Sequence, residues 1–318
     1  MSAPGPRAGA QELLRSTGAL PAEVAAAVRA LAAAASAADG ASALSEDALL
    51  RLDAAPDGVT HLVTAERADD GAAAGYAQLA AAGDGPLGGE LLVHPSLRRR
   101  GTGRRLLAAV RAAAGGAPVA LWSHGDTPGA AALARADGWR RARELWRMER
   151  PAAGLAELVE PELPAGTTVR AFVPGQDDGA WVAVNAAAFA DHPEQGRWTV
   201  DDLRLRLAEP WFEPRLLLLA TGADGDLLAS CWMKVAPDPS DPSGRPVGEL
   251  YVLGVAPSAA GRGLGRALLV RGLRAVVAAS PAPDVVELYV DAGNVPAVRL
   301  YRRLGFERAA VDVQYALP

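Results

Sequence analysis

The stretch GELYVLGVAPSAAGRGLGRALL, residues 248–269, decides how this chain folds. Its apolar first part predicts a strand ending at Val255, after which a glycine-rich turn leads directly into a helical pattern. Glycines at positions 261, 263 and 265 let the backbone approach a ligand closely and point N–H groups outward. Because a helix N-terminus carries partial positive charge, a diphosphate fits there without a lysine. The spacing matches neither a Walker loop nor a Rossmann fingerprint.

The same plan occurs twice in the chain. LLVHPSLRRRGTGRRLLAAV (91–110) aligns with LGVAPSAAGRGLGRALLVRG (253–272), with the proline and two glycines in register. Further along, ARADGW (134–139) aligns with YRRLGF (301–306). One isolated copy is equally compatible with an ordinary strand–turn–helix connection whose glycines only turn the chain. Two matches in the same order favour an internal duplication.

The length of 318 residues suits two domains of roughly 150 residues each. Residues 1–18 are predicted to form a loose leader, and a proline-rich stretch without periodicity follows residue 150. We therefore expect an N-terminal domain over 1–150, a linker over 151–167 and a C-terminal domain over 168–318. Apolar runs alternate with helical patterns in both halves, which indicates an α/β fold class.

Local signals in the second half are strong. RLLLLAT (215–221) and DLLASCWMKV (226–235) flank a turn that contains Gly225, and so predict a hairpin. Thr199 precedes a helical pattern and is followed three residues later by Asp202, which predicts an N-terminal capping arrangement.

Composition excludes several classes of function. The formal net charge is -5, without the strongly basic domain expected of a nucleic-acid binder. His61, His94, His124 and His192 show no ligand spacing with one another or with the single cysteine, Cys231, so we expect no metal. No segment is apolar for long enough to cross a bilayer, and no signal peptide is evident. We expect a cytoplasmic monomer that does not bind membranes.

The segment with a proline, four residues and RGxGR, together with NVPAVRLYRRLGF (294–306), resembles the GNAT acetyltransferase superfamily. More narrowly, the tandem arrangement and ADHPEQGRWT (190–199) resemble the mycothiol synthases of actinobacteria. The resemblance implies two tandem GNAT-type domains, each a mixed, mostly antiparallel sheet flanked by helices. It also implies acetyl-CoA as the acetyl donor. Whether each domain binds one molecule of acetyl-CoA stays open. The implied acceptor is the cysteinyl amine of a cysteine–glucosamine–inositol conjugate.

The resemblance implies a set of coenzyme-binding residues in each half. In the second half, backbone groups hold the pantetheine arm, the bend cradles the diphosphate, and the helix after residue 293 lines the other side; these residues are Leu253, Gly254, Val255, Ala260, Gly261, Arg262, Gly263, Leu264, Gly265, Arg266, Asn294, Val295, Pro296, Ala297, Val298 and Arg299. The first half supplies Leu91, Leu92, Val93, Arg99, Arg100, Gly101, Thr102, Gly103 and Arg104. Ala260 departs from the family, which often has Gln or Arg there, so we expect weakened binding.

Glu249 and Tyr301 are the candidate catalytic residues. Amide formation from an ammonium needs a proton acceptor and stabilisation of the departing thiolate. Strand alternation places Glu249, Tyr251 and Leu253 on one face, where the Glu249 carboxylate can take the proton. Tyr301, seven residues after Asn294 on a predicted helix, is the candidate proton donor to the CoA sulfur. The alternatives are a solvated edge glutamate and a core-packing tyrosine.

The resemblance also implies substrate contacts at Glu46, Glu194, Lys234, Glu249 and Tyr289. Lys234 is alternatively a sheet-face lysine, Glu194 a loop surface charge, and Glu46 an exposed helix glutamate. Cys231, inside a predicted strand, is expected to be a buried small hydrophobe and not a nucleophile. Direct transfer in a ternary complex follows.

The first half lacks the predicted acid–base pair. Register with the second half places Leu87 opposite Glu249 and Ala134 opposite Tyr301. We therefore expect the first domain to bind coenzyme without turning it over. The basic run 98–100 is interpreted as facing phosphate, with a solvated basic patch as the alternative.

Two other functions stay open at this point. The same fold could acetylate an aminoglycoside, a polyamine or a protein N-terminus. A non-catalytic acetyl-CoA sensor is compatible with the degenerate first half, although Glu249 and Tyr301 argue against it.

Overall fold

The computed structural model describes residues 13–54, 58–81, 85–190, 195–237 and 244–317. The chain forms two compact units, one comprising residues 1–143 with 312–318 and the other residues 144–311. The C-terminal segment 312–318 thus belongs to the first unit. The predicted division into consecutive halves around 151–167 assigns this segment to the second half. Residues 152–167 form no helix or strand.

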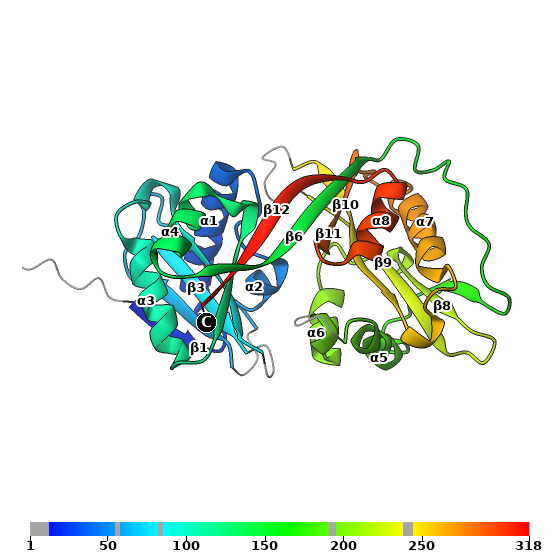
Figure 1. Ribbon diagram of the computed structural model, residues 1–318, viewed down its shortest axis with the longest axis horizontal. Helices are drawn as coiled ribbons and strands as arrows, with labels where there is room; N and C mark the ends of the chain where they lie inside the picture. Colours follow the sequence, from blue (N-terminus) through cyan, green and yellow to red (C-terminus); the bar gives the residue numbers. More distant parts are fainter. Residues whose placement is uncertain (1–12, 55–57, 82–84, 191–194, 238–243, 318) are drawn as a thin grey trace, which may run out of the picture. The chain divides into compact units, whose positions relative to one another are not determined.

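The first unit is a six-stranded sheet with helices packed against it (Figure 1). Its strand order is β1-β2-β3-β4-β5-β12, and only the β4–β5 pair is parallel. Its elements are β1 (Leu13–Thr17), α1 (Ala22–Asp39), α2 (Glu46–Leu50), β2 (Thr60–Thr64), β3 (Gly75–Ala80), β4 (Leu87–Val93), the 3-10 turn η1 (Pro95–Leu97), α3 (Thr102–Ala114), β5 (Val119–Ser123), the short turn η2 (His124–Asp126) and α4 (Pro128–Ala136).

The prediction of a loose leader over residues 1–18 is wrong for β1. Leu13–Thr17 pair antiparallel with β2, so the sheet supplies hydrogen-bond partners that the local sequence does not reveal. Residues 1–12 lie outside the described part of the chain. Helix α2 contains Glu46, for which the sequence allowed a helical position, but its five residues are too few to show a helical period or to predict its bounds.

The second unit repeats this plan with the order β6-β11-β10-β9-β8-β7, in which only β10 and β11 are parallel. Its elements are β6 (Arg140–Pro151), β7 (Thr168–Ala171), α5 (Asp178–Ala188), η3 (Gln195–Arg197), α6 (Val200–Leu207), η4 (Pro214–Leu216), β8 (Leu217–Thr221), β9 (Leu227–Pro237), β10 (Pro246–Val255), η5 (Pro257–Ala259), α7 (Leu264–Val277), β11 (Val285–Asp291), α8 (Val295–Arg303) and β12 (Glu307–Leu317). The first residues of β6 and the last of β12 belong to the first unit.

Two local predictions in this unit are confirmed. Strands β8 and β9 form the antiparallel hairpin predicted around Gly225. Thr199 begins α6 with a reciprocal capping box, in which its hydroxyl accepts from the Asp202 N–H while the Asp202 carboxylate accepts from the Thr199 N–H.

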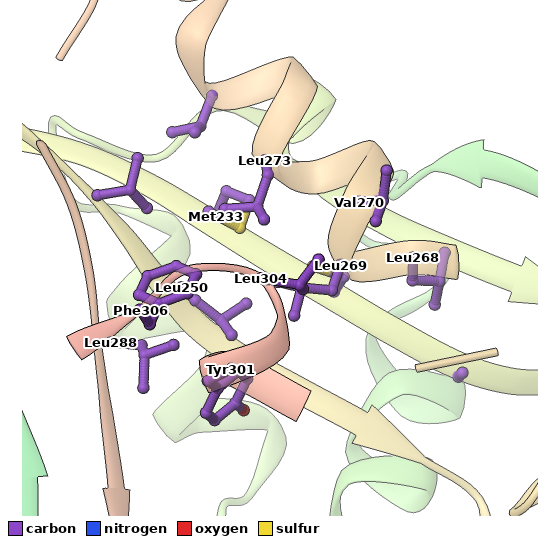
Figure 2. Packing of buried hydrophobic residues seen from close by; sticks show 14 of the residues in the cluster. Met233, Leu250, Leu268, Leu269, Val270, Leu273, Leu288, Tyr301, Leu304 and Phe306 are labelled. Atoms are coloured by element: carbon purple, nitrogen blue, oxygen red, sulfur yellow. The ribbon is translucent and has the colours of Figure 1, made fainter. Parts of the chain in front are cut away.

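The two faces of the second sheet differ in chemistry. Helices α7 and α8 cover an aliphatic core, in which Leu268, Leu269 and Leu273 of α7 pack near Met233 and Leu250 (Figure 2). The opposite face carries an aromatic cluster centred on buried residues that include Trp181, Trp232 and Val252. Gly272 lets α7 lie close to β9, because an added Cβ would come within 2.8 Å of the Cys231 sulfur. Cys231 itself is buried, as predicted, and burial raises the pKa of its thiol to about 12.

Candidate active site

The glycine-rich bend of the second unit is the candidate anion-binding site. Gly261 and Gly263 adopt φ values of 76° and 82°, a region that favours glycine. Helix α7 starts directly after Gly263 with no side-chain cap and no acidic residue in its first turn, whereas Thr199 and Asn294 cap α6 and α8. The first N–H groups of α7 are therefore available to a bound anion. Free N–H groups at an uncapped helix start are what the diphosphate predicted from the sequence would need.

The first unit builds the same bend. Arg99 and Gly101 take φ values of 66° and 90° at the positions that correspond to Gly261 and Gly263. Helix α3 also starts without a side-chain cap or an acidic residue in its first turn. A non-glycine residue in this region is strained by about 1 kcal/mol or more. The bend therefore keeps its conformation at Arg99 against a local energetic cost.

Strands β10 and β11 separate beside the bend. Their parallel ladder covers only Gly248–Leu250, although β10 continues to Val255 and β11 to Asp291. In the described residues, β10 therefore has no strand partner on this side from Val252 to Val255. Its backbone groups there can pair with an extended ligand, which fits the predicted pantetheine contacts at Leu253, Gly254 and Val255. In the first unit the β4–β5 ladder covers only Leu87–Glu90 and leaves Leu91–Val93 in the same situation.

A β-bulge at Tyr251 corrects one prediction. Leu250 lies opposite Met233, but Val252 lies opposite Trp232, so Tyr251 is an extra residue on β10. As a result, Tyr251 and Val252 both belong to the aromatic face, and Leu253 packs against the aliphatic core with Cys231. The prediction that Leu253 shares a face with Glu249 and Tyr251 is therefore wrong. Simple alternation does not foresee an inserted residue.

Glu249 lies on the aromatic side of the sheet beside a lysine. The Lys234 Nζ atom is 3.7 Å from the Glu249 Oε2 atom, and the two side chains are 12% and 21% exposed. The Lys234 ammonium also lies 4.5 Å from the centre of the Trp211 ring and 5.2 Å from that of Tyr251. The structure thus brings together two of the sequence-predicted site residues, a carboxylate and a cation held over aromatic rings.

A second carboxylate, not predicted from the sequence, lies next to Glu249. Glu287 of β11 is the direct register partner of Glu249, and Tyr289, a predicted substrate contact, follows on the same face with 39% of its surface exposed. Burial and the Glu249 charge raise the pKa of Glu287 to about 7, although Arg147 opposes the shift. Tyr289 was predicted from the family resemblance; strand alternation in VVELYVD, which puts Glu287 on the same face as Tyr289, is the signal that could have found Glu287.

Tyr301 lies on the other face of the sheet. Its ring packs in the aliphatic core 6.1 Å from the Phe306 ring (Figure 2), and burial raises the pKa of its hydroxyl. Within the described chain that hydroxyl has no hydrogen-bonding partner. The structure therefore does not place Tyr301 and Glu249 on one face; they occupy opposite sides of the sheet that contains the β10–β11 separation.

Three further residues singled out from the sequence, Glu46, Leu87 and Ala134, lie in the first unit. Glu46 is the first residue of α2, directly after the capping residue Ser45. Leu87 begins β4, and Ala134 is buried in α4, so neither position carries a titratable side chain. Glu194 lies outside the described residues.

The first unit contains a buried ionic cluster that was not predicted from the sequence. His124 lies 3.3 Å from Glu90 and 3.0 Å from Asp312, and Glu90 also accepts hydrogen bonds from the Ser45 N–H and hydroxyl. Burial alone would lower the pKa of His124, but the two carboxylates outweigh it and raise that pKa to about 10. These residues come from β4, η2 and β12, and no local pattern links such distant positions.

No group of three or more metal-ligating side chains with suitable geometry occurs in the described residues. Nor is any helix in those ranges both long and apolar enough to cross a bilayer.

Comparisons with known proteins identify the family of this chain. Residues 180–306 match the acetyltransferase (GNAT) family, and residues 58–141 match an acetyltransferase (GNAT) domain. The mycothiol acetyltransferase of Kineococcus radiotolerans is 64% identical over 94% of this chain and 95% of its own length. That of Thermomonospora curvata is 51% identical over 92% and 93%. This chain belongs to the mycothiol acetyltransferase family.

Solved structures support the same fold. A tandem GNAT protein from the clavulanic acid biosynthesis pathway has a TM-score of 0.69 at 22% identity and covers 96% of this chain and 98% of its own. A GCN5-related N-acetyltransferase from Sphaerobacter thermophilus has a TM-score of 0.61 at 26% identity and covers 96% and 95%. The predicted fold class, two tandem GNAT domains, is confirmed. As a member of this family, the protein is an acetyl-CoA-dependent N-acetyltransferase.

Proposed function

We propose that this acetyltransferase acetylates the cysteinyl amine of 1D-myo-inositol 2-(L-cysteinylamino)-2-deoxy-α-D-glucopyranoside, abbreviated Cys-GlcN-Ins, to give mycothiol. The names of its relatives support the product. The observation that carries the proposal is the Glu249 carboxylate, which lies on the face opposite the aliphatic core, where β10 starts to separate from β11. A carboxylate there can accept a proton from an ammonium.

The proposed chemistry takes place in the second unit. Acetyl-CoA supplies an activated acetyl group when bound, with its diphosphate at the α7 bend and its pantetheine arm along β10. Glu249 accepts a proton from the acceptor ammonium, and the free amine attacks the thioester carbonyl directly. Tyr301, from the other side of the sheet, donates a proton toward the departing sulfur. Buried Cys231, with its raised pKa, takes no part as a nucleophile.

Substrate recognition is proposed for Glu46, Glu194, Lys234, Glu249 and Tyr289. Lys234 and Glu249 form one charged pair, and Tyr289 exposes its ring on the strand that carries Glu287. A polyhydroxylated acceptor with one cationic amine matches this mixture of charge, hydroxyl and aromatic surface. We further propose that the protein acts as a monomer.

We propose that the first unit holds its own acetyl-CoA without turning it over. Its bend and its strand separation repeat those of the second unit, which supports binding. Leu87 and Ala134 occupy the positions of Glu249 and Tyr301, so the acid–base pair is absent there. We also retain the proposal that residues 151–167 link the two functional halves.

The proposal is tested by incubating the protein with acetyl-CoA and a panel of amines while CoA release is followed. Cys-GlcN-Ins is expected to have a kcat/KM far above that of spermidine, an aminoglycoside or a peptide N-terminus. Comparable turnover of the generic polyamine would contradict the proposed acceptor. Binding of acetyl-CoA without turnover of any amine would favour a sensor.

A further inference from the structure

Two carboxylates face one another across the parallel ladder at the point where it ends. Glu249 of β10 and Glu287 of β11 are register partners, and adjacent strands lie about 4.8 Å apart. Residues on either side of Glu287, Val286 and Leu288, are buried in the aliphatic core, so Glu287 projects to the opposite face. Its side chain is 15% exposed. Burial of a second carboxylate beside the proposed base is costly and calls for a compensating role.

The charged groups around Glu287 come from four strands. Arg147 of β6 contacts both Glu287, at 3.0 Å, and Glu149, at 2.7 Å. Lys234 of β9 contacts Glu249, and Tyr289 follows Glu287 on β11. Glu287 therefore pairs with Arg147 and Glu249 with Lys234, and these two cations lie on the strands that flank β11 and β10.

We propose that Glu287 is a positioning residue for acetyl transfer, which acts by increasing the proton affinity of the Glu249 carboxylate. This inference rests on the proposed function and assigns a role to a residue that the family comparison does not. An ionised neighbour makes Glu249 a stronger proton acceptor, because a proton placed on it relieves the repulsion between two adjacent negative charges.

The acceptor ammonium gives one proton to Glu249, and the nitrogen lone pair then forms the C–N bond to the acetyl carbon. The C–S bond breaks and leaves its electron pair on sulfur. A second proton from nitrogen then reaches the sulfur, by way of Tyr301 or water, and gives the CoA thiol. One proton per turnover leaves the carboxylate pair for solvent.

The position of the titration supports this role. The pKa of Glu287 is raised to about 7 by burial and by the Glu249 charge. Glu287 is therefore ionised above that pH and protonated below it, and it loses its effect on Glu249 as the pH falls. The rate of acetyl transfer should show a step near neutral pH that belongs to Glu287.

The experiment measures the single-turnover rate of acetylation of Cys-GlcN-Ins, with enzyme and acetyl-CoA in excess, from pH 5.5 to pH 9, because product release does not enter this rate. The wild type is expected to slow about three- to tenfold as the pH falls through about 7. Glu287→Gln should stay at the lower rate and lose the step. Arg147→Met, which removes the cation that opposes the pKa shift, should move the step to higher pH by roughly one unit.

Glu149→Gln is the matched control, because Glu149 is the other carboxylate on Arg147. Because the Glu149 charge is the smallest of the contributions that raise the pKa of Glu287, this variant should move the step only slightly, and to lower pH, opposite to Arg147→Met. If the step persists unchanged in both Glu287→Gln and Arg147→Met, Glu287 only anchors Arg147 and the inference is wrong. If Glu287→Gln does not fold, Arg147→Met alone tests the inference: a step at higher pH supports it, and an unshifted step or one at lower pH contradicts it. A wild type that does not acetylate Cys-GlcN-Ins at any pH refutes the proposed function instead.

Discussion

The Lys234 ammonium lies 3.7 Å from the Glu249 carboxylate while resting over the Trp211 ring. The lysine thus holds the proposed base in one orientation at the end of the β10–β11 ladder. Largely buried charge pairs of this kind can fix geometry without stabilising the fold much, because desolvation offsets their attraction. Their contribution to function is accessible to substitution.

Lys234→Met should lower kcat/KM about three- to tenfold, because the Glu249 carboxylate loses the cation that orients it while the aliphatic chain keeps its packing on Trp211. Lys234→Arg, which keeps the cation, is the control and should lose less activity. Steady-state kinetics with Cys-GlcN-Ins measure both. Equal activity of Lys234→Met and wild type would show that the ion pair does not serve the base.

Removing the Tyr301 hydroxyl should slow turnover with little change in coenzyme affinity. The Tyr301→Phe ring can remain packed against Phe306, so the aliphatic core is preserved. We expect kcat to fall about tenfold, which corresponds to about 1.4 kcal/mol of transition-state stabilisation. Calorimetric titration with CoA gives the affinity, and CoA release gives kcat. A variant with wild-type kcat would leave Tyr301 as a packing residue only.

Gly272→Ala should destabilise the second unit. The added Cβ would lie 2.8 Å from the Cys231 sulfur and 2.9 Å from Met233 Cγ, so α7 must move away from β9. We expect a loss of about 1–3 kcal/mol in chemical unfolding. Gly179→Ala in α5 is the matched control, since its Cβ would meet nothing within 4 Å; it should stabilise by about 0.5–1 kcal/mol. Similar stability of the two variants would contradict the close packing of α7.

The His124 cluster predicts a pH-dependent stability of the first unit. Because the folded-state pKa of His124 is raised to about 10, its stabilising contribution is complete below about pH 6.5 and is lost as the pH rises through 10. Glu90 has the opposite dependence, since its pKa is lowered in the folded state even though burial works against that shift. Its contribution is lost as the pH falls below the usual range of a glutamate.

Hydrogen exchange of the β4 and β5 amides at pH 6, 8 and 10, corrected for intrinsic exchange rates, measures the loss of stability of the first unit. Protection in the wild type should fall toward pH 10, and His124→Ala should lower it at pH 6 by about 3 kcal/mol, because two buried carboxylates lose their cation. Arg29→Ala, which breaks a solvent-exposed ion pair with Asp53, is the control and should change little. Unchanged protection in His124→Ala would show that the cluster is not a buried ionic network.

Local signals in the sequence predicted most of the second unit. The Thr199 capping box, the hairpin around Gly225 and the bend at Gly261 and Gly263 each depend on residues a few positions apart. The duplication then carried the same plan to the first unit. Recognition of the family supplied the site residues that spacing alone leaves undetermined.

Features that depend on strand register were not predictable in this way. The bulge at Tyr251 follows from the pairing of β10 with β9, and it moves Leu253 to the opposite face. The partnership of Glu249 with Glu287 requires knowing which strands are neighbours and where their ladder ends. Likewise, β12 brings Asp312 to His124 from the far end of the chain.

Acetyl transfer is proposed to take place in the second unit through Glu249, whereas the corresponding position of the first unit, Leu87, takes no part. The decisive comparison is kcat/KM for Cys-GlcN-Ins in Glu249→Gln and in Leu87→Gln, with folding checked by circular dichroism. We expect kcat/KM to fall about tenfold or more in Glu249→Gln and to stay unchanged in Leu87→Gln. Full activity of Glu249→Gln, or loss of activity in the well-folded Leu87→Gln variant, would contradict it.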